Sequence, residues 1–138
     1  MDNIIIVMFA AIIIIGGLLL LVIIMTRKGP RVLDQSTYRS KWLAIESILG
    51  SDEATRHIAI IKADTLLDRA LRERGVKGAT MGDRMKQAKS LFSNNNAIWA
   101  AHKLRNKIAH EDDITIQDKT ARQALKAFKI ALKDVGAL

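Results

Sequence analysis

An uninterrupted apolar run over residues 4–25 is the feature that most constrains this chain. It reads IIIVMFAAIIIIGGLLLLVIIM and contains no charged residue. As an α-helix at about 1.5 Å per residue, such a run extends roughly 33 Å, enough to cross a hydrocarbon core of about 30 Å. A cleaved signal peptide is the rival interpretation, but it needs a basic start, a shorter apolar segment and a small-residue cleavage site, which Met25-Thr26-Arg27 does not supply. We therefore expect an uncleaved anchor over residues 1–25 that contacts the lipid bilayer through residues 4–25.

Positive charge lies on one side of this run. All 22 Lys and Arg residues follow it, Asp2 is the single charged residue before it, and the formal net charge is +8. Arg27, Lys28 and Arg31 come directly after the run, and the cytoplasmic flanks of membrane helices are enriched in Lys and Arg. The charge pattern therefore predicts a single-pass membrane protein whose C-terminal part is cytoplasmic.

The rest of the chain has the composition of one small globular domain. Gly29 and Pro30 are expected to end the apolar helix, which makes residues 26–36 a short basic linker and residues 37–138 the domain. The chain has no cysteine, so disulfides, thiolate metal sites and a cysteine nucleophile are excluded. One proline and eight glycines exclude collagen-like and Pro/Gly-rich low-complexity chains.

Helical periodicity continues through residues 37–138, and no useful length of strand-like alternation interrupts it. Five amphipathic helices are expected, over about 37–49, 51–74, 80–92, 97–110 and 118–135. Thr80 with Asp83, and Thr115 with Asp118, have the spacing of capping boxes at two helix starts. The predicted fold class is therefore all-α: an N-terminal transmembrane helix followed by a small four- to five-helix bundle. A core this small stabilises the domain only marginally, so we expect a second subunit to add stability, as in a homodimer.

Three expectations concern side chains on these helices. Trp42 and Trp99 fall on apolar helix faces and are expected in the core. Asp68 is spaced to form an ion pair with Arg72 on the second helix. Asp64, four residues before Asp68, receives no catalytic assignment.

Motifs for several kinds of chemistry are absent. The chain has no glycine-rich phosphate loop, no G-x-S-x-G and no HExxH, and we expect neither a cofactor nor a metal, since the three histidines are scattered. The distinctive segment is the fourth helix, with its apolar stripe of Ile98, Ala101, Leu104 and Ile108. Beside this stripe lie His102, Arg105, Asn106 and Ala109, and His110 falls at the edge where the helix ends.

The segment Arg105-Asn106-Lys-Ile-Ala-His110 resembles the R-x(4–6)-H motif of the HEPN superfamily, including the polar residue after the arginine. The place of the motif on the penultimate helix and the number of helices add to this resemblance. It implies a small, usually dimeric helical bundle. It also implies a metal-independent endoribonuclease with a composite site at the dimer interface, where Arg105, Asn106 and His110 would be the catalytic residues and RNA the substrate.

These residue types suit metal-free RNA cleavage. Histidine titrates near neutral pH and can act as base or acid, and arginine stays charged and offers a planar fork to phosphate oxygens. Alternatively, Arg105 and Asn106 solvate a helix face and His110 interacts with the helix dipole. The function would then be a non-catalytic, membrane-tethered RNA-binding or protein-interaction module, or a subunit that scaffolds a membrane complex.

A basic stripe follows the last helix. Its members are spaced three or four residues apart, and they are Lys119, Arg122, Lys126, Lys129 and Lys133. Such a stripe can follow the backbone of bound RNA, lie against anionic lipid headgroups, or simply face solvent. The sequence leaves these three roles open, and the first is the nucleic-acid-binding prediction.

The charge asymmetry gives a test of topology. A reporter fused after Leu138 should be active in the cytoplasm, because Arg27, Lys28 and Arg31 hold that flank of the anchor inside. Activity of a reporter that functions outside the cytoplasm would contradict this orientation and remove the domain from cytoplasmic RNA.

Overall fold

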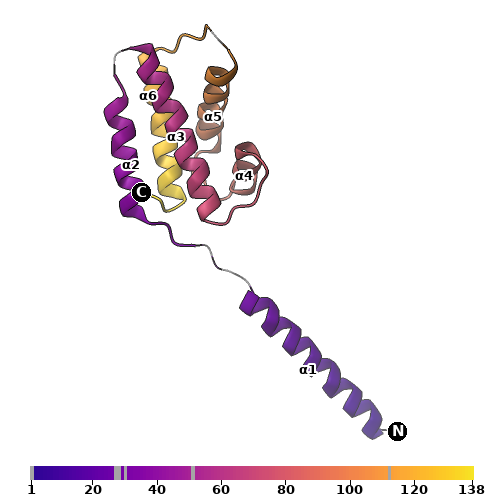
Figure 1. The fold of residues 1–138 in the computed structure, drawn as a ribbon. Helices are drawn as coiled ribbons and strands as arrows, with labels where there is room; N and C mark the ends of the chain where they lie inside the picture. The colour runs from indigo at the N-terminus through magenta and orange to yellow at the C-terminus, as the bar shows by residue number, and fades with distance from the viewer. Residues whose placement is uncertain (1, 27–28, 30, 51, 112) are drawn as a thin grey trace. The chain divides into compact units, whose positions relative to one another are not determined.

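The computed structural model describes residues 2–26, 29, 31–50, 52–111 and 113–138. Arg27, Lys28, Pro30 and Ser51, on which parts of the predicted topology, linker and second helix rest, lie outside these ranges. The described residues form six helices and no strand, so the all-α class is confirmed (Figure 1). The helices are α1 (Asp2–Thr26), α2 (Gln35–Ile48), α3 (Glu53–Glu73), α4 (Met81–Gln87), α5 (Asn95–His110) and α6 (Asp118–Asp134).

The chain divides into two compact units, Met1–Pro30 and Arg31–Leu138. The first contains α1, in which Asn3–Thr26 has a mean hydropathy of 3.2 and no buried part. The helix is apolar on every side, which suits lipid rather than a core packed on one face. By length and composition α1 can cross a membrane.

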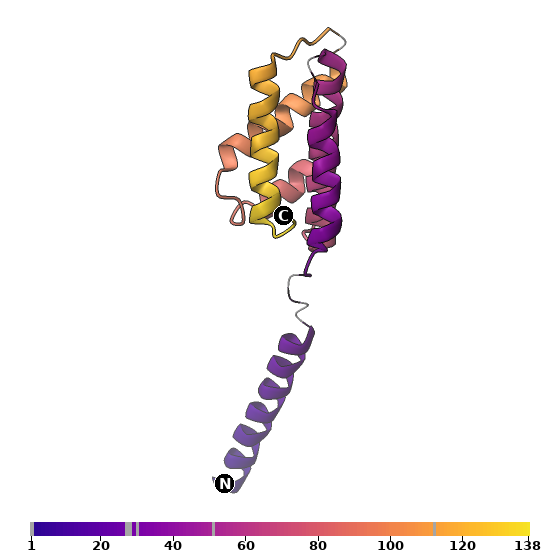
Figure 2. The ribbon, with the colours of Figure 1, turned by 90° about the vertical axis from the view of Figure 1, so that its left-hand side faces the viewer.

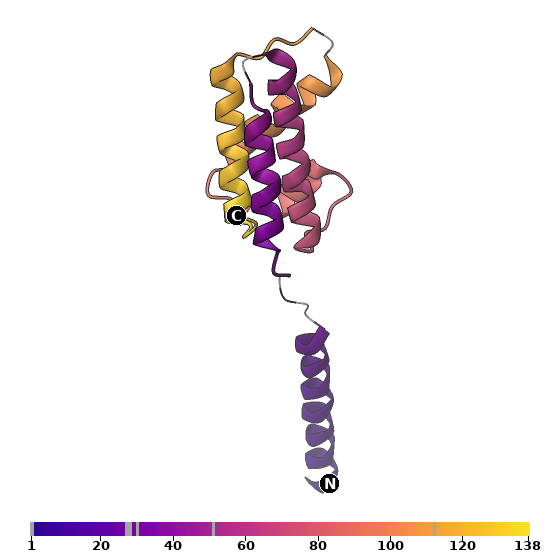
Figure 3. The ribbon, with the colours of Figure 1, turned by 60° about the vertical axis from the view of Figure 1, so that its left-hand side comes forward.

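The second unit is a bundle with α3 at its centre. Helix α3 packs against α2, α4, α5 and α6, and α5 also packs against α6. Figure 3 shows α2, α3 and α6 side by side, and Figure 2 shows α5 crossing behind α6 at a tilt. The apolar stripe of α3 is fully buried and consists of Ile60, Ala63, Leu67, Ala70 and Leu71. Its position makes α3 the element against which the other helices of the bundle are placed.

Helix starts follow local side-chain chemistry. Helix α2 begins at Gln35, two residues earlier than expected, because Asp34 accepts hydrogen bonds from the backbone N–H groups of Ser36 and Thr37. Hydrogen bonds from Thr37 and Ser36 lower the pKa of Asp34 to about 2. These bonds satisfy donors that the first turn leaves without a partner.

The capping box of Thr80 and Asp83 is confirmed, with each side chain accepting from the other residue's backbone N–H. The one expected at Thr115 is wrong, because α6 is capped by Gln117 without a side-chain hydrogen bond. Helix α4 also ends at Gln87 rather than near 92, since the next turns close through i→i−3 bonds.

A buried arginine fastens α4 to α3. Arg84 is 4% exposed, and its guanidinium lies 2.6 Å from Asp68 and 2.6 Å from the carbonyl oxygen of Gly78. Asp68 also forms the expected ion pair with Arg72, at 2.8 Å. The backbone of the segment between α3 and α4 therefore lies close to Arg84. A Cβ at Gly78 would lie 2.7 Å from the backbone nitrogen of Arg84.

This close approach predicts different effects for two glycines. Gly78→Ala should lower the free energy of unfolding by about 1–3 kcal/mol, the usual range for overpacking, because backbone atoms must move. Gly82→Ala is the matched control, since its Cβ would meet nothing closer than 3.8 Å. Urea denaturation followed by tryptophan fluorescence measures both, and equal stabilities for the two variants would contradict the role given to Gly78.

Candidate functional site

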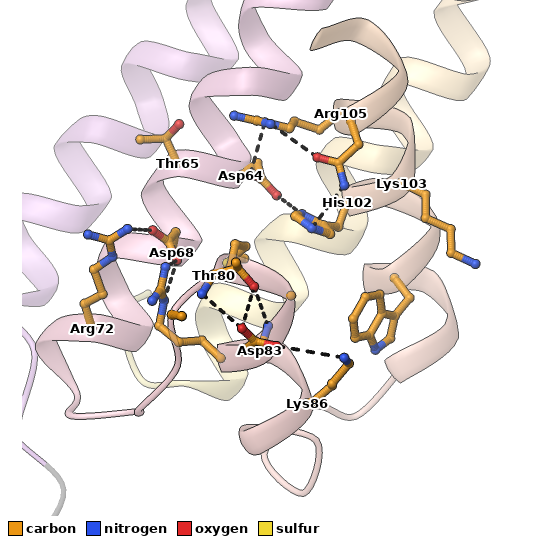
Figure 4. A pocket seen from close by; sticks show the side chains of 16 residues that line it. Asp64, Thr65, Asp68, Arg72, Thr80, Asp83, Lys86, His102, Lys103 and Arg105 are labelled. Carbon is orange, nitrogen blue, oxygen red and sulfur yellow. Dashed lines mark hydrogen bonds and ion pairs between the residues drawn. The ribbon is translucent and has the colours of Figure 1, made fainter. Parts of the chain in front are cut away.

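A cleft of about 610 Å³ lies between α3, α4 and α5 (Figure 4). Five cationic and three acidic side chains line it, which leaves an excess of positive charge. The cationic ones are Arg72, Arg84, Lys86, Lys103 and Arg105, and the acidic ones are Asp64, Asp68 and Asp83. The cleft therefore favours an anionic ligand over a cationic one.

Asp64 and Arg84 are the two most deeply buried charged groups that line this cleft. Asp64 lies on the inward face of α3, between the buried Ile60 and Leu67, and is 4% exposed. A carboxylate in such a position requires hydrogen-bond donors or a counter-charge, because burial removes its water. Both come from α5, which packs against α3.

The side chains around Asp64 form one hydrogen-bonded network. His102 Nδ1 lies 2.7 Å from Asp64 Oδ1, and His102 Nε2 lies 3.3 Å from Asn106 Nδ2. Arg105 Nη1 donates to Asn106 Oδ1 at 3.2 Å, which fixes the orientation of the amide. Asn106 Nδ2 is then the donor to His102 Nε2, so the ring proton is assigned to Nδ1 and donated to Asp64.

Arg105 stands at the edge of this network, with one side toward the cleft. Its Nε lies 3.4 Å from Asp64 Oδ2, an ion pair without hydrogen-bond geometry. The side chain is 31% exposed. Guanidinium has five N–H donors, and Arg105 donates one to Asn106, so donors remain for an anion entering the cleft.

The predicted motif residues are divided by the structure. Arg105 and Asn106 line the cleft together. His110 is exposed at the last position of α5, and its side chain makes no hydrogen bond or ion pair with another described residue. Residues five apart on an ideal helix point about 140° apart. Arg105 and His110 therefore do not meet at one point of a single chain in this conformation.

His102 is the site residue that sequence reasoning did not single out. It is buried, and its ring, rather than that of His110, lies beside Asn106. The signal was the spacing of His102, Arg105 and Asn106 at i, i+3 and i+4. The second signal was Asp64, a carboxylate inside the apolar stripe of α3.

The two tryptophans differ from each other. Trp42 is buried in the core, as expected, with Lys129 Nζ 5.8 Å from its ring centroid. Trp99 is partly exposed and lines the cleft, with its ring edge-on to His102 at 6.0 Å between centroids. Trp99 thus packs on the histidine of the network.

The basic stripe of α6 is partly neutralised within the bundle. Arg122 Nε lies 2.7 Å from Asp118, and Lys129 Nζ lies 2.7 Å from Glu46. The hydrogen bond from Lys129 lowers the pKa of Glu46. The other three members are exposed and make no ion pair among the described residues. They are Lys119, Lys126 and Lys133.

Comparison with known proteins finds no relative of this chain. No protein-family model, curated protein or solved structure matches the chain. Within the described part of the chain, no group of three His, Asp or Glu side chains is placed to hold a metal ion. The assignment of the cleft therefore rests on its own geometry and charge.

The network around Asp64 predicts a stability effect. Asp64→Ala removes the acceptor of the His102 Nδ1–H and the counter-charge of Arg105, which should cost about 1–3 kcal/mol. Asp64→Asn keeps an acceptor and should cost less. Asp118→Ala is the control, because it removes a carboxylate from an exposed pair with Arg122 and should change stability little. If chemical denaturation gave Asp64→Ala the stability of the wild type, His102 and Arg105 would not depend on Asp64.

Proposed function

We propose that the domain is a HEPN-like, metal-independent endoribonuclease that acts on RNA as a homodimer. The observation that carries this proposal is the state of Arg105. Asp64 and Asn106 hold it at the edge of a cleft with excess positive charge, and about a third of its side chain (31%) stays exposed. A guanidinium held in position before the ligand arrives is suited to stabilising charge on a phosphate.

The chemistry needs a base, an acid and a cation. A base takes the proton of the 2′-hydroxyl, whose oxygen then attacks phosphorus. The bond from phosphorus to the 5′-oxygen breaks, and an acid donates a proton to that oxygen. The products are a 2′,3′-cyclic phosphate and a 5′-hydroxyl. Arg105 stabilises the charged phosphorane, and His110 of each subunit serves as base or acid.

A second subunit would bring together the two motif residues, Arg105 and His110, that one chain holds apart. Because His110 is exposed at the end of α5, a two-fold arrangement with α5 near the axis can bring the His110 of one subunit to the Arg105 of the other. Helix α1 would hold this dimer in the membrane, with the domain facing cytoplasmic RNA. Asn106 would hold Arg105 in position and would take no part in proton transfer.

A non-catalytic, membrane-tethered RNA-binding or protein-interaction module is the second candidate. The observation that favours it is the separation of Arg105 and His110 on α5. Arg105 lines the cleft, whereas His110 does not. In this function Arg105 and the exposed lysines bind phosphate groups, and His110 has no chemical role.

RNA cleavage by the full chain in zwitterionic lipid nanodiscs separates the two candidates. Single-stranded RNA should be cut with EDTA present, and the products should end in a 2′,3′-cyclic phosphate. His110→Ala and Arg105→Ala should each lower the rate by roughly two orders of magnitude or more, the scale for losing a general base or an oxyanion donor. An excess of His110→Ala chain should also inhibit the wild type, because mixed dimers lack half of the shared site.

Lys129→Ala is the control, since Lys129 is paired with Glu46 and should leave cleavage nearly unchanged. Binding without cleavage, weakened by Arg105→Ala and insensitive to His110→Ala, would favour the non-catalytic module. Cleavage that persists in both motif variants would reject the proposed site.

A further inference from the structure

A second groove, of about 670 Å³, lies between α5 and α6. These two helices pack directly against each other, and Figure 2 shows how they cross. The groove uses a flank of α5 other than the one that carries Arg105. Its lining is mainly apolar and built largely from small side chains of the two helices, with three uncharged polar residues, Asn94, Thr120 and Gln123, beside them. The apolar members, called the floor below, are Ala97, Ala100, Ala101, Leu104, Ala124, Ala127 and Ile130. Alanines let another backbone come close, as helices do when they pack at interaxial distances of about 8–10 Å.

Lysines form the charged rim of this groove. Lys103 and Lys107 come from α5 and Lys126 comes from α6. All three are exposed, and none makes an ion pair within the described ranges. No acidic side chain of the described residues lines the groove. The apolar floor thus has an uncompensated positive border on both helices.

We infer that this groove binds an amphipathic helix of a partner protein, one whose apolar face is flanked by Asp and Glu. An apolar stripe at i, i+3, i+4 and i+7 covers the floor in the manner of helix-in-groove recognition. Carboxylates on both sides of that stripe meet the lysine rim, which sets specificity and speeds encounter. The inference rests on the groove alone and holds whether or not the cleft cleaves RNA.

Charge argues against two other occupants. A second copy that presented the same groove across a two-fold axis would bring its own three lysines against these three. RNA would match the lysines but would leave the apolar floor uncovered. Among the described residues, the groove also has no aromatic ring in its lining on which bases could stack. A helix that is apolar on one side and acidic at the borders satisfies both features.

A designed peptide tests this complementarity. The probe is a labelled helical peptide of about 16 residues, the length of α5, with a Leu/Ala stripe flanked by Glu. A matched peptide carries Lys in place of every Glu. Fluorescence anisotropy with the full chain in zwitterionic nanodiscs should show saturable binding of the acidic peptide alone, weakened by salt.

Three variants locate the binding. Lys107→Glu combined with Lys126→Glu should weaken the acidic peptide at least tenfold. Ala100→Trp, at an exposed position of the floor, should abolish its binding. Lys119→Glu combined with Lys133→Glu is the matched control, because it makes the same charge change at exposed positions of α6 outside the groove and should have no such effect.

Several outcomes would overturn the inference. They are failure of the acidic peptide to bind, equal binding of the basic peptide, and binding that Ala100→Trp leaves unchanged. Loss of RNA binding in Ala100→Trp would assign the groove to RNA, and loss of self-association in that variant would assign it to a second copy. Because these measurements use no cleavage, they stay distinct from the test of the ribonuclease.

Discussion

Asp64 is the buried charge around which the functional side of the bundle is organised. Its carboxylate lies in the apolar face of the central helix and is compensated by His102 and Arg105 of α5. Removing either partner would leave the buried carboxylate with only part of its compensation, so the packing of α5 on α3 and the position of Arg105 are coupled. Asn106 closes the network by joining the histidine to the arginine. A site held in this way is fixed by the fold before any ligand binds.

Ion pairs within the bundle decide where positive charge stays uncompensated on α5 and α6. On α6, Arg122 and Lys129 are engaged with Asp118 and Glu46, so the continuous basic stripe becomes a few isolated lysines. On α5, Lys103 lies between the cleft and the apolar groove and lines both. A partner bound in the groove would neutralise charge next to the cleft, which couples the two surfaces electrostatically if both are used.

Periodicity was enough to predict the helices of the bundle, because their apolar faces repeat at 3.6 residues, and the capping box of Thr80 and Asp83 marked the start of α4. Capping patterns did not predict the start of α6 or the end of α4. The site was harder to predict from the sequence. Asp64 and His102 are 38 residues apart, and their contact depends on how α3 and α5 pack rather than on any local pattern. The motif residue Arg105 was placed correctly on a polar face, but the histidine beside it in space is His102, since His110 lies past the packed part of α5.

The central claim is that Arg105 and His110 contact the same RNA phosphate region. Nuclear magnetic resonance of the full chain in nanodiscs, with labelled arginine and histidine side chains, tests it directly. The titrant is a 2′-O-methyl RNA oligonucleotide, which lacks the attacking hydroxyl and stays intact. The account predicts that the Arg105 Nε–H and His110 ring signals shift along one saturation curve. Binding that shifts neither signal, or that shifts only one of the two, would contradict it.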